Sequence, residues 1–188
     1  MHVGPVRQLP FAIAPPSVIV VMGVSGCGKS TIGKRLGTAL DWPFRDADTF
    51  HPEANIAKMK SGQALDDADR APWLRAIADW IDRHRLDDTS GIVSCSALKQ
   101  RYRDVLLQGR ADVGLVYLKG SYALIGSRVS RRRSHFMPPT LLKSQFDALE
   151  EPTAEENALV ISVRMTPKRI VEAIVAHFML APVRRVLA

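Results

Sequence analysis

The sequence predicts an α/β fold in which a five-stranded parallel sheet lies between two layers of helices. Short runs rich in β-branched residues alternate with longer segments whose apolar residues recur at helical spacing. This alternation is typical of parallel strands joined by crossover helices. The 188 residues contain no internal repeat and no low-complexity linker, so we expect one domain.

A glycine-rich loop directly follows the first expected strand, residues 18–21. Its sequence, Gly23-Val-Ser-Gly-Cys-Gly-Lys-Ser30, fits G-x-x-x-x-G-K-[ST] at every fixed position, and a helical pattern follows it. A chance glycine turn would not account for both flanks. The N–H groups of such a loop surround phosphate oxygens, and the helix N-terminus adds positive potential. The motif therefore predicts a P-loop protein that binds a nucleoside triphosphate, without indicating what accepts the phosphate.

The loop and the start of its helix supply the expected nucleotide-binding residues. Lys29 is expected to reach the β- and γ-phosphates, and the Ser30 hydroxyl to bind Mg²⁺. The full expected set in this segment is Gly23, Val24, Ser25, Gly26, Cys27, Gly28, Lys29, Ser30 and Thr31. We interpret Cys27 as a small residue at a variable motif position, without a redox role.

The remaining elements follow in alternation. After the first helix we expect a second strand within residues 42–48 that ends in the carboxylates Asp46 and Asp48, and an acidic turn at residues 65–69. Further strands are expected at residues 92–95, 113–118 and 159–163, and helices at residues 51–60, 70–84, 99–109, 121–132, 141–149 and from 167 onward. The carboxyl ends of parallel strands share one edge, so the loop, both carboxylates and Ser96 should meet there.

Composition limits the compartment and the partners. No apolar run approaches the ~20 residues of a membrane span, and the two cysteines suggest no disulfide framework, which favours the cytoplasm. The net charge of +7 suits small polyanionic ligands. The sequence lacks the alternation of aromatic and basic residues that is typical of a surface binding single-stranded nucleic acid. We expect a flexible extension at residues 1–16, a kinase domain at 17–180 and a tail at 181–188.

Two absences narrow the class of P-loop protein. The sequence has no N-K-x-D motif for reading guanine, and the expected third strand carries no acidic residue near its end. The acidic pair instead ends the second strand, which is typical of small-molecule kinases. These observations favour a kinase over a GTP-dependent switch or a hydrolysing ATPase.

Longer motifs sharpen this interpretation. Residues 46–74 contain D-x-D-x-x-H-P, N-x-x-K-M, G-x-x-L and D-R-x-P-W-L, and residues 95–99 read Cys-Ser-Ala-Leu-Lys. Further blocks are Tyr117–Gly120, His135-Phe136, Gln145-Phe146 and Leu149–Pro152. On these residues the chain resembles the gluconokinase family, within the shikimate-kinase-like group, from about Val18 to Met179. The resemblance implies phosphorylation of D-gluconate on its 6-hydroxyl by ATP with Mg²⁺, and a homodimer.

Position and resemblance together suggest roles for several residues. Asp46 is expected to act at the metal with Ser30, and Asp48 to orient the acceptor hydroxyl and take its proton; a turn acid is the alternative for each. One or more of Arg128, Arg132 and Arg133, on a mobile lid at about residues 128–140, are expected to reach the phosphoryl group; Arg128 is expected to bind the nucleotide, and Arg132 to be catalytic alongside Lys29. The expected substrate-binding residues are Asp48, His51, Asn55, Lys58, Arg70, Lys99 and Arg103, with the cation for the carboxylate unranked.

Three alternatives remain open from the sequence. Another small-molecule kinase of this group is the nearer alternative: nucleoside monophosphate kinases share the general layout, whereas shikimate kinases are disfavoured because residues 94–97 lack their glycine-rich end of the third strand. A non-catalytic nucleotide-sensing module that grips nucleic acid through the basic lid belongs to a different class. Trp73 could stack on a sugar, although its helical spacing favours a place in the core.

Overall fold

A computed structural model describes residues 16–61, 63, 65–131 and 139–183 of the chain. Its centre is a five-stranded sheet in the order β2-β3-β1-β4-β5, and every pair of neighbouring strands is parallel. The strands are β1 (Val18–Met22), β2 (Phe44–Asp46), β3 (Gly91–Cys95), β4 (Val113–Lys119) and β5 (Leu159–Ser162). The predicted fold class is confirmed.

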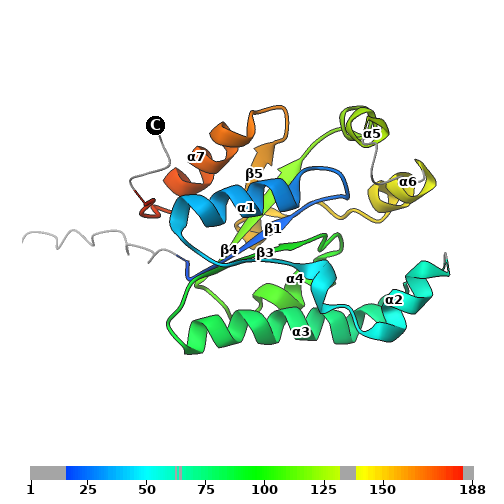
Figure 1. Ribbon diagram of the computed structural model, residues 1–188, viewed down its shortest axis with the longest axis horizontal. Coiled ribbons are helices and arrows are strands. Elements are labelled where there is room, and N and C mark those ends of the chain that lie inside the picture. The colour runs from blue at the N-terminus through cyan, green and yellow to red at the C-terminus, as the bar shows by residue number, and fades with distance from the viewer. Residues whose placement is uncertain (1–15, 62, 64, 132–138, 184–188) are drawn as a thin grey trace, which may run out of the picture.

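Helices cover both faces of this sheet (Figure 1). They are α1 (Lys29–Leu40), α2 (Glu53–Lys60), α3 (Asp67–Leu86), α4 (Gln100–Leu107), α5 (Tyr122–Ser130), α6 (Pro139–Asp147) and α7 (Pro167–His177), with two 3₁₀ turns, η1 (Ala47–Phe50) and η2 (Ala154–Glu156). In Figure 1, α1 and α7 lie on one side of the sheet and α3 and α4 on the other, while α2 and α6 project at the end where the phosphate loop lies.

The central strand β1 divides the core into two halves. Ile19 and Val21 pack in the half that contains α1 and α7, whereas Val18 and Val20 pack in the half that contains α3 and α4. Successive side chains of a strand point to opposite faces, so an uninterrupted apolar run is what a strand covered on both sides requires. All five residues of β1 are fully buried.

Two of the element boundaries that differ from the predictions bear on the site. Residues 67–69, expected in a turn, form the first turn of α3, because the Asp66 side chain accepts the Asp69 N–H while the Asp69 side chain accepts the Asp66 N–H. The acidic residues that indicated a turn also suit a helix N-terminus. Likewise β2 ends at Asp46, so Asp48 lies in η1 instead of on the strand.

The ends of the chain stay largely outside this description. Residues 1–15 of the expected extension and residues 184–188 of the expected tail are not among the described residues. Within the described part, no helix combines the length and apolarity that crossing a membrane would need.

Candidate phosphoryl-transfer site

The phosphate loop connects β1 to α1 through a backbone that needs glycine. Gly23, Gly26 and Gly28 have φ values of +142°, +82° and +109°. A Cβ added to Gly23 would lie 2.9 Å from the carbonyl oxygen of Leu118, which cannot move without disturbing β4. The loop conformation therefore depends on these glycines, as the motif predicts.

Lys29 lies across this loop. Its ammonium group donates hydrogen bonds to the carbonyl oxygens of Gly23, at 3.0 Å, and Val24, at 3.2 Å. The lysine is the first residue of α1, so its side chain starts at the helix N-terminus and folds back over the loop. This arrangement holds a positive charge beside the N–H groups that are expected to bind phosphate.

Ser30 and Asp46 bring a hydroxyl and a carboxylate together beside the loop. The Ser30 hydroxyl donates to Oδ2 of Asp46 at 2.6 Å, and Oδ1 of Asp46 accepts the N–H of Asp48 at 3.3 Å. These hard oxygen ligands suit Mg²⁺, which takes one or two protein oxygens and completes its shell with phosphates and water. No group of three or more His, Cys, Asp or Glu residues that could hold a metal occurs among the described residues. One hydroxyl and one carboxylate fit a magnesium ion whose other ligands are phosphate and water oxygens.

Ser94 on β3 adds a polar group that the sequence reasoning missed. It is registered with Asp46 of β2 and Val21 of β1. Its side chain is 1% exposed, and its Oγ has no hydrogen-bond partner in the described structure. A serine within an apolar strand is an ordinary small residue, so the sequence offered no signal for this buried hydroxyl.

Asp48 and His51 follow at the same edge. Asp48 is exposed on η1, and its carbonyl oxygen accepts the His51 N–H at 3.4 Å. The His51 ring stacks on Trp73 with centroids 4.6 Å apart, and its buried Nδ1 has no partner in the described structure. Burial lowers the pKa of His51, and the Arg70 charge lowers it further although Asp48 opposes both. His51 is therefore a neutral ring at neutral pH.

Trp73 belongs to the core, as predicted. It is 2% exposed, and its indole N–H donates to the carbonyl oxygen of Ala47 at 2.7 Å. One face of the indole carries His51, so Trp73 supports a predicted substrate residue without presenting its own ring to a sugar.

The polar face of α2 joins α3 instead of facing solvent. Asn55 is 5% exposed, and its amide donates to the carbonyl oxygen of Asp69 at 2.7 Å. Lys58 forms an ion pair with Asp69 and lies 3.6 Å from Asp66, and the hydrogen bond to Asp69 raises its pKa. Asn55 and Lys58 thus hold the first turn of α3 in place. Gly62, which begins the G-x-x-L motif, lies outside the described residues.

A second group of cations surrounds Tyr102 at the start of α4. Asp67 accepts hydrogen bonds from Tyr102 and Arg101, and lies 3.4 Å from the ammonium of Lys99. Arg70 differs: Nη2 donates to the carbonyl oxygen of Leu65 at 3.2 Å, and the guanidinium lies 5.9 Å from the Tyr102 ring. No carboxylate of the described residues pairs with Arg70.

The structure gives Arg103 a place other than the expected one. The side chain is 1% exposed; Nε and Nη2 donate to Glu156, and Nη1 donates to the carbonyl oxygen of Glu150 at 2.8 Å. Nη1 also lies within hydrogen-bond distance of the carbonyl oxygens of Ala97 and Leu98. With all three nitrogens engaged inside the protein, Arg103 is a structural residue and does not face a substrate carboxylate.

The predicted phosphoryl-contacting arginines are only partly described. Arg128 of α5 is half-buried, and its Nη2 donates to the carbonyl oxygen of Val163 at 2.6 Å. Arg132 and Arg133 lie outside the described residues, as does most of the expected lid. Cys27 is 2% exposed, and burial raises the pKa of its thiol, which favours the interpretation of Cys27 as a packing residue.

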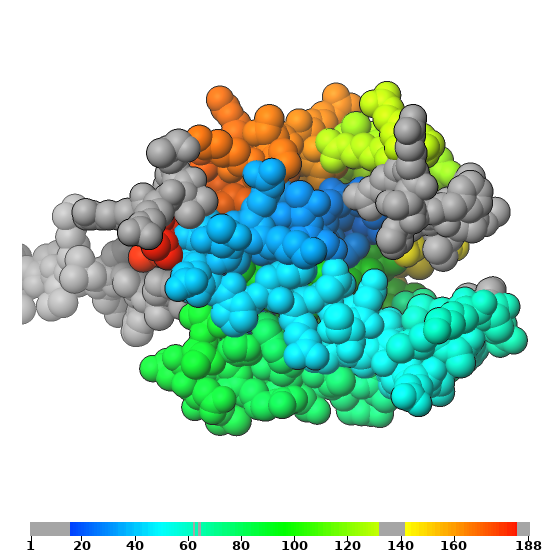
Figure 2. Space-filling view, in the orientation of Figure 1, coloured from blue at the N-terminus to red at the C-terminus, as the bar shows by residue number. Residues whose placement is uncertain are grey.

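Gln145 of α6 is a second residue to which the sequence analysis assigned no role. Its Oε1 accepts the N–H of Ser25, inside the phosphate loop, at 2.6 Å. Figure 2 shows the surface hollowed between α2 and α6, at the end of the molecule where the loop lies. The two helices therefore border the region around the site from opposite sides.

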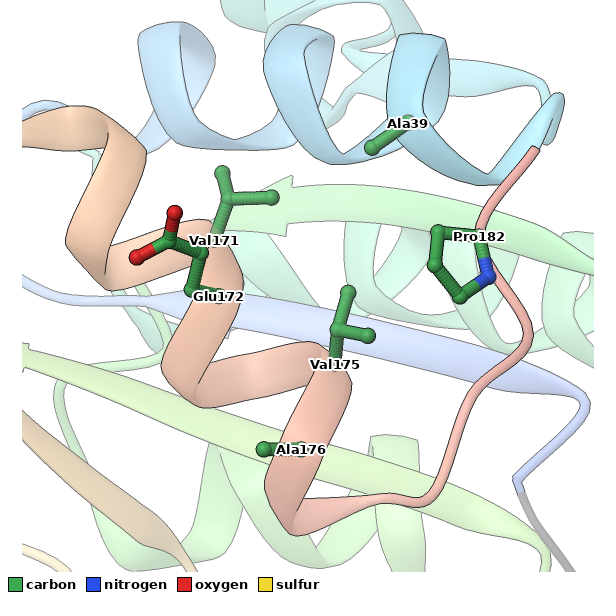
Figure 3. A pocket seen from close by; sticks show the side chains of 6 residues that line it. All are labelled: Ala39, Val171, Glu172, Val175, Ala176 and Pro182. Atoms are coloured by element: carbon green, nitrogen blue, oxygen red, sulfur yellow. The ribbon is translucent and has the colours of Figure 1, made fainter. Parts of the chain in front are cut away.

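An apolar cavity lies elsewhere. It has a volume of about 230 Å³ and lies between α1, α7 and the segment after α7, where it is lined by Ala39, Val171, Glu172, Val175, Ala176 and Pro182 (Figure 3). Ala39 is near the C-terminal end of α1, whereas Lys29 begins that helix. The cavity is therefore remote from the phosphate loop, and its apolar lining does not suit a phosphate.

Comparisons with known proteins agree with this geometry. A family model described as shikimate kinase matches residues 25–178. A probable gluconokinase from Rattus norvegicus is 46% identical over 166 residues, covering 79% of this chain and 90% of the relative. A gluconokinase from Gluconobacter oxydans is 40% identical over 163 residues, covering 87% and 92%. The crystal structure of a gluconokinase from Sinorhizobium meliloti superimposes with a TM-score of 0.79 at 39% identity, covering 88% and 93%.

Proposed function

This chain belongs to the gluconokinase family of P-loop kinases, and from that premise we propose that it transfers the γ-phosphoryl group of ATP to the 6-hydroxyl of D-gluconate. The observation that carries the proposal is the contact of Ser30 with Asp46 at 2.6 Å, beside Lys29 and the phosphate loop. It unites a nucleotide-binding motif with the carboxylate that ends β2. The candidate substrate residues follow in the chain: His51 comes directly after η1, Lys58 lies on α2 and Arg70 lies on α3.

The phosphate loop and Lys29 bind the nucleotide in this proposal. The loop N–H groups donate to the phosphate oxygens, and the Lys29 ammonium neutralises the charge that develops on the transferred group. Lys29 already lies against the loop carbonyls, so a small movement of a flexible side chain brings it to the phosphates. Its removal is therefore expected to affect binding and turnover together.

Ser30 and Asp46 are the residues proposed to hold Mg²⁺. When bound there, the ion supplies positive charge that the phosphates need for transfer. Ser30 offers its hydroxyl oxygen, and Asp46 offers a carboxylate that the N–H of Asp48 orients. Lys29 and the loop fix the position of the phosphates relative to both.

Asp48 is proposed to orient the acceptor hydroxyl and accept its proton. It is exposed and lies two residues beyond Asp46. Its negative charge is close enough to His51 to act against the lowering of the pKa of that ring. A carboxylate free of strong intramolecular partners can hydrogen-bond to an incoming hydroxyl. Asp46, by contrast, is already bonded to Ser30.

Arg70 is proposed to hold the carboxylate of gluconate. Lys58 and Lys99 are each paired with an aspartate, and Arg103 is buried against Glu156. Of the four candidate cations, Arg70 alone has no carboxylate partner among the described residues. Its positive charge is close enough to His51 to lower the pKa of that ring. Arginine also offers the two parallel donors that a carboxylate accepts best. Lys58 and Lys99, paired with Asp69 and Asp67, then hold the first turn of α3 in place.

Arg128 and Arg132 are proposed to bring further positive charge to the phosphoryl group. Arg128 lies on α5, whose Val129 packs against Gly26 of the loop. Arg132 follows that helix in the chain and remains a sequence prediction, since it lies outside the described residues. Both would act by stabilising charge in the transition state.

A coupled assay of ADP release tests the function. Purified protein with ATP and Mg²⁺ should release ADP at a rate that depends on D-gluconate, while shikimate and nucleoside monophosphates should add little. Release no faster with gluconate than without it would refute the proposal. Faster release with shikimate would instead assign the chain to another kinase of the same group.

Two properties of the molecule as a whole also belong to the proposal. We propose that the enzyme is a cytoplasmic homodimer; the resemblance to its family supports the dimer, and two buried, unpaired cysteines agree with a reducing compartment. Light scattering on the purified chain measures the mass of the particle. A monomeric mass at working concentrations would contradict the proposed dimer but not the proposed activity.

A further inference from the structure

Gln145 contacts the phosphate loop from a helix that the proposed reaction does not otherwise use. Its Oε1 accepts a 2.6 Å hydrogen bond from the N–H of Ser25, although the two residues are 120 positions apart. Ser25 lies inside the motif whose N–H groups are expected to bind phosphate oxygens. An uncharged amide oxygen therefore already bonds to one of the expected phosphate donors.

The packing of α5 and α6 holds Gln145 at this position. Val129 of α5 lies against the loop so closely that a Cβ on Gly26 would be 2.4 Å from a Val129 methyl group. On α6, Phe146 packs edge-to-face on Tyr122 of α5 with ring centroids 5.4 Å apart, and Leu142 is 3% exposed. Both helices lie at the loop end of the molecule in Figure 1. Apolar packing therefore holds α6 against α5 and α5 against the phosphate loop, and this places Gln145 beside Ser25.

We propose that Gln145 is a displaceable occupant of the phosphate loop, and that a phosphoryl oxygen of ATP competes with it for the N–H of Ser25. The inference rests on the proposed binding of ATP at this loop. A charged phosphate oxygen makes a stronger hydrogen bond than a neutral amide oxygen, so the nucleotide wins. ATP binding then breaks the hydrogen bond between Gln145 and Ser25, so that α6 loses this contact with the phosphate loop when nucleotide is bound.

Calorimetric titration of the full chain with ATP and Mg²⁺, without gluconate, tests this competition. Gln145→Ala removes the competitor, and we expect the Kd for ATP to fall by about two- to tenfold, as loss of one neutral hydrogen bond from the free state implies. Gln145→Asn keeps the amide but is one methylene shorter, and should reproduce this effect. Gln108→Ala is the matched control, because Gln108 is an exposed glutamine at the end of α4, and should leave the Kd unchanged.

Gln145→Glu changes the affinity in the opposite direction. It presents a carboxylate to the same N–H and repels phosphate, so we expect the Kd for ATP to rise by roughly tenfold or more. Weaker or unchanged ATP binding by Gln145→Ala and Gln145→Asn would overturn the proposal. Should those variants fail to fold, unchanged affinity in Gln145→Glu would overturn it. Wild-type protein that binds no ATP would refute the proposed function instead, so the two failures are distinguishable.

Discussion

At the scale of single residues, Asp46 links the phosphate loop to the acceptor side of the site. One carboxylate oxygen accepts the Ser30 hydroxyl, the other accepts the N–H of Asp48, and its carbonyl oxygen accepts the Thr49 hydroxyl at 2.7 Å. These bonds fix the backbone of η1, and with it the position of Asp48 and His51. A change at Asp46 should therefore disturb metal and acceptor together, whereas changes at Asp48 and Arg70 can separate individual roles.

Asp48→Asn should lower turnover more than tenfold, because proton transfer by a positioned side chain contributes about 10²- to 10⁴-fold. The Kd for ATP should change little, since among the described residues the hydrogen bonds of Asp48 go to Asp46 and His51 and none reaches the phosphate loop. Steady-state kinetics and titration with ATP measure the two quantities. Lys29→Ala should abolish turnover, and Asp41→Asn, an exposed aspartate beyond α1, should have no effect. More than about a tenth of wild-type turnover in Asp48→Asn would exclude the proton-accepting role.

Arg70→Ala should raise the KM for gluconate by roughly tenfold to hundredfold, the range expected for a lost hydrogen bond to a charged group. Lys99→Ala should have a smaller effect, because Asp67 already pairs with that ammonium. The KM for ATP should stay constant in both variants. Arg75→Ala, an exposed arginine on the same helix, serves as the control. A larger change in Lys99→Ala than in Arg70→Ala would move the carboxylate site to Lys99.

At the scale of elements, the first turn of α3 organises the substrate side of the site. It carries Asp67 and Asp69, which pair with Lys99 and Lys58 respectively, and Arg70 follows directly. Asn55 of α2 bonds to the backbone of the same turn. The orientation of four predicted substrate residues therefore depends on where α3 begins.

Asp66→Ala should lower the free energy of unfolding by about 1 kcal/mol, because it removes the side chain that caps α3. Asp66→Ser should lower it less, since serine keeps a capping oxygen while losing the charge near Lys58. Urea unfolding followed by circular dichroism measures both. Asp87→Ala, at the other end of α3, is the matched control and should be neutral, as an acidic residue does not stabilise a helix C-terminus. Equal losses in Asp66→Ser and Asp66→Ala would show that the charge, and not the cap, stabilises this turn.

At the scale of the whole molecule, the ion pair of Arg103 with Glu156 joins α4 to the segment that leads into β5. Arg103 lies on α4 and Glu156 in η2, just before β5, and the side chains are 1% and 9% exposed. Removing one partner of a buried ion pair leaves the other charge unpaired and costs about 3–5 kcal/mol. Arg103→Ala should therefore destabilise the protein strongly, through packing and charge and not through substrate binding.

The same pair predicts a pH dependence. Hydrogen bonds from Arg103 lower the pKa of Glu156, so its stabilising effect is complete above the ordinary glutamate pKa of about 4.3 and is lost as pH falls through the lower value of the folded state. The difference in unfolding free energy between wild type and Glu156→Gln should shrink between about pH 6 and pH 3. Using the difference cancels the similar contributions of other paired carboxylates. A difference that stays constant over this range would contradict the assignment.

The fold class and the nucleotide-binding half of the site could be predicted from the sequence. The loop motif, the strand before it and the helix after it are contiguous, so local order alone indicates their arrangement. The place of Asp46 at the end of β2 followed from the rule that parallel strands end at one edge, whereas Asp48, expected on the strand, lies in η1. Strand and helix boundaries were predicted to within a few residues, except where the acidic residues of the α3 cap resembled a turn.

The partners of the long polar side chains came only with the three-dimensional structure. Arg103 is 53 positions from Glu156, and Ser25 is 120 positions from Gln145. No periodicity or spacing links such positions, because a flexible cation can pair with any carboxylate that the fold brings near. Whether an arginine is buried and neutralised or left free for a substrate is therefore a property of the packed chain, and that difference separates Arg103 from Arg70.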